Sequence, residues 1–221
     1  NEKNFVVATN AMISYTPRTK IKVQEEDIHF DLDANDMRMY SDYVKRKKLK
    51  DMVSLCHNAS LKKIVEVTCN QIREGRKVFV VGKTKSDQNI LGTMLLKELN
   101  GKHIACIDCD VDGTDCITVI NLTDEKVEKN EVKDYDIVIG AEKKCTGYNL
   151  TRMNVMVSGV YFGNEANRTQ IRGRINRLSQ NNDTVYYFYV HTGVLSLVYN
   201  NHNLAKIASQ CIQSKKINQK D

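Results

Sequence analysis

Residues 77–85 read Lys-Val-Phe-Val-Val-Gly-Lys-Thr-Lys, and this stretch decides the fold class. The unbroken apolar run Val78–Val81 is typical of a strand buried on both faces of a parallel sheet, because a strand with one wet face would alternate apolar and polar residues. Small and polar residues follow, and residues 86–100 have the pattern of a helix. A buried strand that leads directly into a helix is the repeating unit of α/β proteins.

The same unit recurs along the chain. Further apolar runs, each predicting a buried strand, lie at 104–107, 137–139, 155–157 with 160–162, and 185–190. Helical patterns lie at 123–133, 165–178 and 193–212, while 111–122 fits neither type. We therefore predict an open, mostly parallel α/β sheet with helices on both faces.

A different pattern precedes this domain. Residues 20–24 and 28–32 alternate and predict two short strands in an antiparallel or edge setting. Asp33–Asp36 supplies N-cap residues for a first helix, and a second helix is expected over 60–74, ending at Gly75. We divide the chain into a strand-helix extension (1–58), an α/β domain (59–212) and a polar tail (213–221) that we expect to fray.

Composition sets broad limits. Of the 221 residues, 41% are apolar and 27% charged, which excludes collagen-like and wholly disordered classes. No apolar run reaches the roughly 18 residues of a membrane-spanning helix, so we expect no membrane association. The odd number of cysteines, seven, favours a reduced, intracellular location. Because the chain opens Asn1-Glu2 without an initiator Met, we expect it to be a piece of a longer protein.

The loop after the first buried strand carries two lysines and a threonine: Lys83, Thr84 and Lys85. A phosphate-binding P-loop would need a glycine five positions before Gly82, where this chain has Lys77. The loop nevertheless lies at the carboxyl end of a parallel strand, where such sheets bind ligands. It either holds a nucleic-acid phosphate or is a solvated loop.

The segment 170–177 reads Gln-Ile-Arg-Gly-Arg-Ile-Asn-Arg. On a helix, Gln170, Arg174 and Arg177 would share one face, and an apolar stripe of Ile171, Ile175 and Leu178 would anchor that helix to the sheet. Guanidinium groups are permanently charged and match phosphate oxygens, so this pattern predicts an anion site. The alternative is a surface helix paired to acidic neighbours, of which Glu165 is the only one nearby in sequence.

A third segment, 140–150, follows the strand at 137–139. Gly147 permits a turn with positive φ, and the Asn149 amide offers both a donor and an acceptor to a ligand hydroxyl.

Taken together, these segments resemble the motifs of superfamily-two helicases. Cys-Thr-Gly-Tyr-Asn-Leu at 145–150 is similar to motif V, and 170–177 is similar to motif VI, Gln-x-x-Gly-Arg-x-x-Arg. Arg-Leu-Ser-Gln at 177–180 extends motif VI in the style of the Swi/Snf-like branch, and 78–85 is similar to motif IV.

This resemblance implies the second RecA-like domain of an ATP-dependent helicase or translocase. A first RecA-like domain of the same full-length chain would bind most of the ATP and Mg²⁺, so the present chain alone would be inactive. Arg174 and Arg177 would act as arginine fingers beside Gln170, and Gly147 and Asn149 would approach the nucleotide. The nucleic-acid backbone would be held by Lys83, Thr84, Lys85 and Thr146. No residue is predicted to ligate a metal.

Three alternatives stay open. The substrate is expected to be duplex DNA, but motifs V and VI do not separate DNA from RNA helicases. The chain could instead be a non-catalytic helicase-like scaffold, or an unrelated doubly wound enzyme such as a nucleotide-sugar transferase.

A basic run, Lys45–Lys48 with Lys50, either binds phosphates or forms a solvated helical face.

Overall fold

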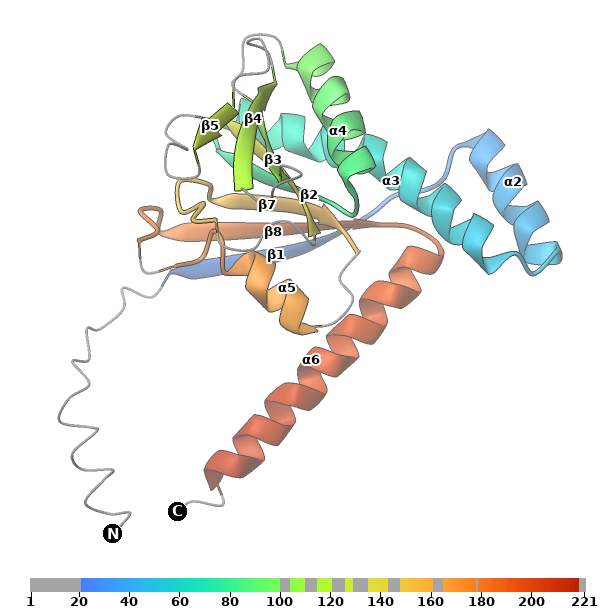
Figure 1. Ribbon diagram of the computed structural model, residues 1–221. Coiled ribbons are helices and arrows are strands. Elements are labelled where there is room, and N and C mark those ends of the chain that lie inside the picture. Colours follow the sequence, from blue (N-terminus) through green and yellow to red (C-terminus); the bar gives the residue numbers. More distant parts are fainter. Residues whose placement is uncertain are drawn as a thin grey trace.

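The computed structural model describes residues 21–99, 104–109, 115–120, 126–128, 135–142, 148–160, 165–177 and 179–218. They form an eight-stranded sheet with the order β1-β8-β7-β2-β6-β3-β4-β5 (Figure 1). The first six of these strands run parallel: β1 (Lys22–His29), β8 (Thr184–His191), β7 (Val155–Gly159), β2 (Val78–Gly82), β6 (Ile137–Ala141) and β3 (Ile104–Cys109). Two antiparallel strands, β4 (Asp115–Ile120) and β5 (Lys126–Glu128), complete one edge. The predicted open, mostly parallel α/β sheet is confirmed.

Helices cover both faces of the sheet. α3 (Leu49–Arg73) and α4 (Lys85–Glu98) lie on one face, and α5 (Glu165–Arg172) and α6 (Val194–Asn218) lie on the other (Figure 1). Strand β2 shows why its residues are all apolar: Val78 and Val80 pack into the core under α3 and α4, while Phe79 and Val81 pack into the core under α5 and α6. All four side chains are fully buried.

The N-terminal elements differ from the prediction. Instead of two short strands, residues 22–29 form one strand that pairs with β8 in parallel along its whole length. The charged residues Glu25–Asp27 do not interrupt it, because β1 is an edge strand and its side chains are largely exposed. The prediction of a helix after Asp33 is correct: the carboxylate of this residue caps α2 (Ala34–Lys45) by accepting from the N–H groups of Asn35 and Asp36.

Several helix limits were also wrong. α3 begins at Leu49 instead of residue 60, so the boundary that we placed between 58 and 59 falls inside this helix. It ends before Gly75, whose φ of 76° suits glycine at a helix terminus, as predicted. Residues 126–128 form a strand where a helix was expected. α6 continues to Asn218, through much of the tail that we expected to fray.

Within the described residues, no helix combines the length and apolar character that crossing a bilayer requires. The same ranges contain no cluster of three or more His, Cys, Asp or Glu side chains suited to hold a metal ion.

Candidate functional site

The predicted site residues that the structure describes lie at two opposite ends of the sheet. Because six strands are parallel, their carboxyl ends share one edge, and the loop 83–85 follows β2 at that edge. The segments that contain Asn149 and Arg174 lie at the other end, where the N–H groups of Asn154 and Val155 both donate to the Lys77 carbonyl, at 3.2 Å. Five residues of β2 separate the two ends by about 16 Å.

The chain leaves the helical conformation before Arg174. α5 ends at Arg172, and the N–H of Arg174 donates to the Ile171 carbonyl at 3.0 Å, which is a tighter i to i−3 bond. Gly173 disfavours a longer helix, since glycine has low helix propensity. The prediction of a helix to residue 178 was therefore wrong, and Gln170, Arg174 and Arg177 do not share one helical face.

Two of the three predicted anchors of this segment are in place. Ile171 and Ile175 are buried, at 4% and 0% exposure, whereas Leu178 lies outside the described residues. Gln170 is exposed, and Arg174 and Arg177 are half-buried. We call residues 173–177 the arginine turn.

Backbone hydrogen bonds join the arginine turn to the segment that contains Asn149. The Leu150 N–H donates to the Arg174 carbonyl at 2.9 Å. Asn149 itself is exposed between two buried anchors, Tyr148 and Leu150, each 1% exposed. The structure thus brings together two segments that the sequence separates by about 25 residues. Gly147, which was predicted to approach the nucleotide with Asn149, and Thr146, which was predicted to hold the nucleic-acid backbone, lie outside the described residues.

Gln180, the last residue of the Arg-Leu-Ser-Gln extension of motif VI, reinforces this junction. The buried Gln180 amide donates to the carbonyls of Met153, at 2.9 Å, and Ile175, at 2.7 Å. Its oxygen accepts from the backbone N–H of Asn182 at 3.0 Å. Because both sides of the amide are used, Gln180 fixes the arginine turn against the segment 150–153.

Arg177 is held by its own turn. Its Nε donates to the Gly173 carbonyl at 2.7 Å, so the side chain folds back across the arginine turn. Within the described part of the chain, no carboxylate forms an ion pair with Arg177.

The other two arginines of the run are bound inside the protein. Arg168 is fully buried, and its guanidinium contacts Glu25 of β1 at 2.5 Å, with Arg172 bonded to the same carboxylate oxygen. Arg168 also donates to the hydroxyls of Tyr189 and Tyr199, at 3.4 and 3.3 Å. We call Arg168, Arg172, Glu25, Tyr189 and Tyr199 the Glu25 cluster.

Burial and neighbouring charges shift the pKa values of the Glu25 cluster. Burial alone would raise the pKa of Glu25, but the attraction of Arg172, Arg168 and Lys206 outweighs it and leaves the pKa lowered. Burial raises the pKa of Tyr189 to about 12, so its hydroxyl stays protonated. Glu25 was not predicted as a partner of these arginines, because it lies 143 residues before Arg168.

At the opposite end of the sheet, the loop 83–85 has its backbone already occupied. The Asp87 carboxylate accepts from the N–H groups of Lys83 and Thr84, both at 2.9 Å, and its other oxygen contacts His57 Nε2 at 2.9 Å. These amides are therefore not available to a triphosphate, in agreement with the missing P-loop glycine. The side chains of Lys83, Thr84 and Lys85 are exposed at this edge.

Asp87 is held as a carboxylate. Burial would raise its pKa, but the hydrogen bond and charge of His57 and the backbone N–H groups lower it. Thr84 and Asp87 form a capping box at the start of α4, and the spacing Thr-x-x-Asp is the local signal that could have predicted this helix start.

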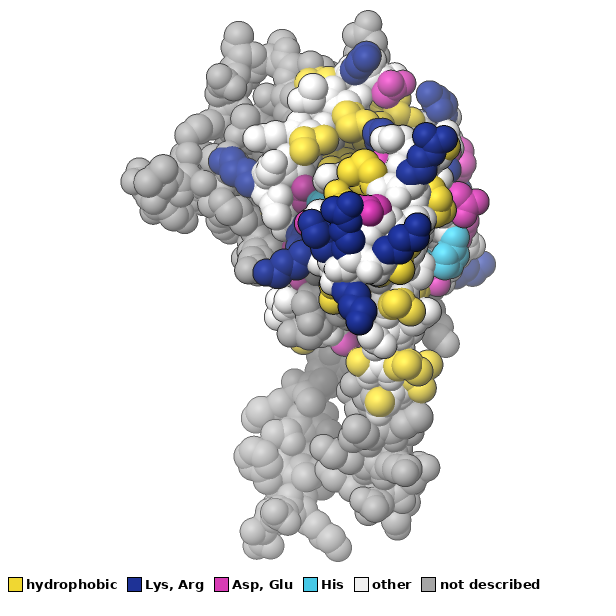
Figure 2. Space-filling model, turned by 90° about the vertical axis from the view of Figure 1, so that its right-hand side faces the viewer, with side chains coloured by type: hydrophobic (Ala, Val, Ile, Leu, Met, Phe, Trp, Pro, Cys, Tyr) yellow, Lys and Arg dark blue, Asp and Glu magenta, His cyan; other side chains and the backbone are white. Residues whose placement is uncertain are grey.

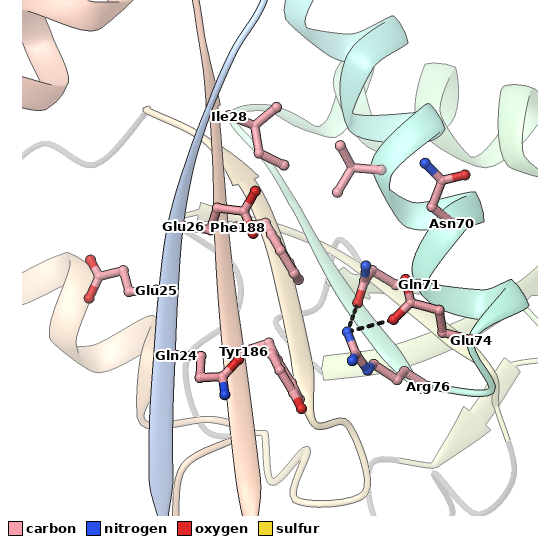
Figure 3. A pocket seen from close by; sticks show the side chains of 11 residues that line it. Gln24, Glu25, Glu26, Ile28, Asn70, Gln71, Glu74, Arg76, Tyr186 and Phe188 are labelled. Carbon is pink, nitrogen blue, oxygen red and sulfur yellow. Dashed lines mark hydrogen bonds and ion pairs between the residues drawn. The ribbon is translucent and has the colours of Figure 1, made fainter.

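A groove of about 520 Å³ opens between β1, β8 and α3, away from both sets of residues (Figure 3). Tyr186 and Phe188 form its apolar wall, and the Arg76 guanidinium stacks over Tyr186 at 4.0 Å. Arg76 also bonds to Gln71 and Glu74. Figure 3 shows Glu25 pointing away from this groove, on the far side of β1. Since Arg76 is already paired with Glu74, we do not assign the groove to the candidate site.

Solved structures identify the architecture. The chain is similar to the C-terminal part of the Fun30 ATPase domain, with 19% identity over 66% of this chain and 44% of that chain, and a TM-score of 0.47. It is also similar to the UvsW protein of T4, with 12% identity over 79% of this chain and 33% of that chain, and a TM-score of 0.50. The chain has a RecA-like fold. The RecA-like α/β fold that the sequence motifs implied is thus confirmed.

Other comparisons add no relative: no family model matches the chain, and no curated protein does. The chain spans a third to under half of the two solved chains.

Proposed function

We propose that this chain is the C-terminal motor domain of an ATP-dependent helicase or translocase that acts on nucleic acid, with duplex DNA as the favoured substrate. The observation that carries the proposal is the junction of the arginine turn with the Asn149 segment, made by the bond between Leu150 N–H and the Arg174 carbonyl. This junction fixes two half-buried arginines beside an exposed amide at one end of a RecA-like sheet.

Bound ATP would supply the phosphoryl group whose transfer to water releases energy, and a first RecA-like domain would hold most of it together with Mg²⁺. The residues of this chain would act by position and charge. Arg174 and Arg177 would stabilise the negative charge that develops on the γ-phosphate oxygens, which in such enzymes contributes on the order of 10³–10⁵ in rate. Gln170 would line the interdomain contact, and Asn149, with Gly147, would contact the nucleotide sugar.

The carboxyl end of the sheet would contact the nucleic acid. Because Asp87 occupies the backbone amides of Lys83 and Thr84, phosphate contacts there would come from the side chains of Lys83, Thr84 and Lys85 and, as the resemblance to motif V implies, from Thr146.

One chain segment connects these two ends. β6 ends at Ala141 at the carboxyl edge, and nine residues later Leu150 bonds to the arginine turn. The segment 142–150 therefore offers a short covalent route between the nucleic-acid contacts and the nucleotide contacts.

The test is Arg174→Ala in the full-length protein. We expect ATP turnover to fall by on the order of 10³ or more, with affinity for nucleic acid within a few fold of wild type, because the two sites lie at opposite ends of the sheet. Arg73→Ala, which removes an exposed arginine at the end of α3, is the matched control and should leave turnover unchanged. Wild-type turnover in Arg174→Ala would contradict the proposal.

Assays with duplex DNA, single-stranded DNA and RNA distinguish the alternatives. Stimulation by duplex DNA alone would agree with a DNA translocase, and stimulation by RNA alone would favour an RNA helicase. A wild-type protein that binds nucleic acid without turning over ATP would favour a scaffold.

A further inference from the structure

The connection between α2 and α3 places a lysine in a conformation that favours glycine. Lys47 has φ of 55°, and it is the one non-glycine residue with positive φ in the described ranges. The Lys48 N–H donates to the Tyr43 carbonyl at 2.9 Å, and the Lys47 N–H donates to the Val44 carbonyl at 3.1 Å. This pair of bonds is a Schellman motif, in which the left-handed position is usually glycine.

Lysine in place of glycine at this position costs roughly 1 kcal/mol of backbone energy. Strained residues of this kind persist only where the surrounding structure holds them, and they concentrate at functional sites. Here the strain presents one more positive charge at the apex of the α2–α3 hairpin.

The apex is densely basic and exposed. Lys45, Arg46, Lys47, Lys48 and Lys50 are all exposed. Arg46 pairs with Asp42 at 3.0 Å, and Lys48 pairs with Asp51 at 3.7 Å. For Lys45, Lys47 and Lys50, the described residues provide no ion pair. Three mutually repelling ammonium groups are thus left on one short connection, which favours an anionic partner.

The apex also lies beyond the loop 83–85, on the same side of the molecule. The contact of His57 with Asp87 places α3 beside this loop. From His57, α3 runs a further seven residues outward to Lys50, about 10 Å at the helical rise. Each strand of duplex DNA carries a phosphate about every 3.4 Å along its axis, so the length of α3 between its contact with this loop and the apex spans about three phosphates.

Figure 2 views this side of the molecule. Lys and Arg side chains spread over it, with hydrophobic side chains between them. Leu49 and Val44, which are 63% and 47% exposed, belong to the apex itself.

We propose that the α2–α3 apex binds the phosphate backbone of the nucleic acid and extends the contact of the loop 83–85 by about three phosphates. Lys45, Lys47 and Lys50 make the contacts. This inference rests on the proposed function, since it assumes that the protein engages nucleic acid at the carboxyl end of its sheet.

The test compares Lys45→Gln/Lys50→Gln with wild type in the full-length protein, by binding to a 20-base-pair DNA duplex at several salt concentrations. Two lost phosphate contacts should reduce the slope of log affinity against log salt by about 1.8, and should weaken binding about 10- to 60-fold at 0.1 M salt. Duplex RNA and single-stranded DNA of the same length show which backbone is preferred. Lys22→Gln/Lys97→Gln removes the same charge from exposed lysines at the amino end of the sheet and should stay within about twofold of wild type.

Lys47→Gly separates binding from folding. It relieves the left-handed strain, so the free energy of unfolding should rise while affinity for the duplex falls several-fold. A purely structural lysine would not move these two quantities in opposite directions. If both apex variants bind as the control pair does, the apex contact is refuted while the proposed function stands. If wild type binds none of the three nucleic acids, both fail.

Discussion

Four arginines fall within ten residues of this chain, and the structure divides them into two kinds. Arg168 and Arg172 point into the Glu25 cluster, where one carboxylate and two tyrosine hydroxyls surround them. Arg174 and Arg177 lie two and five residues beyond the end of α5 at Arg172, and are half-buried on the arginine turn. The first pair joins β1, α5 and the tyrosines of β8 and α6, while the second pair is fixed mainly through its backbone.

Substitutions in the two pairs of arginines should therefore have different effects on the protein. Removing a partner from a buried ion pair leaves an uncompensated charge and destabilises the fold. Removing a partly exposed arginine from a turn that the backbone already holds should cost little stability. The Glu25 cluster should therefore govern folding, and the arginine turn should govern activity.

Glu25→Ala is the largest expected change in stability. It leaves the buried Arg168 guanidinium without its main carboxylate, so we expect a loss of about 3 kcal/mol in the free energy of unfolding, measured by denaturant titration. Glu26→Ala is the control, because the Glu26 side chain is exposed on the other face of β1 and should cost less than about 0.5 kcal/mol. Equal effects of the two substitutions would remove the distinction between the pairs of arginines.

Lowering the pH should weaken the Glu25 cluster gradually, and by less than the Glu25→Ala substitution does. The pKa of Glu25 is lower in the folded protein than its ordinary value of 4.5, so its stabilising contribution is complete above about pH 4.5 and is lost as pH falls through the folded pKa. The difference in unfolding free energy between wild type and Glu25→Gln should thus shrink below pH 4.5. A difference that stays constant down to pH 3 would exclude this ionic contribution.

Local sequence predicted much of the fold. The apolar run at 78–81 and its repeats predicted the parallel strands, because burial on both faces demands apolar residues at every position. Asp33 and Gly75 predicted helix ends correctly, because caps depend on a few adjacent residues. The strand β1 was predicted wrongly. How much three consecutive acidic residues destabilise a strand depends on whether the strand is central or at an edge of the sheet, and the local sequence does not show this.

The candidate site was predicted less completely, because it depends on contacts between segments that are distant in the sequence. The motif around Arg174 and Arg177 could be recognised, but whether the helix reaches them depends on Gly173 and on the bond from Leu150 to Arg174. Glu25 and His57 could not be found from local patterns, because each contacts its partner across 30 residues or more.

The central claim is that Arg174 and Arg177 serve one shared site while Arg168 and Arg172 serve the fold. Its most direct test is single-turnover ATP hydrolysis by full-length Arg174→Ala/Arg177→Ala, beside each single variant, with the free energy of unfolding measured for all three. The effects of substituting residues that act as a unit do not add, so the double variant should be no more than a few fold slower than the slower single variant. Its hydrolysis rate should be on the order of 10³ or more below that of wild type. The free energy of unfolding of all three variants should stay within about 1 kcal/mol of wild type. Near wild-type hydrolysis in the double variant, or a loss of activity that follows a loss of folding, would contradict it.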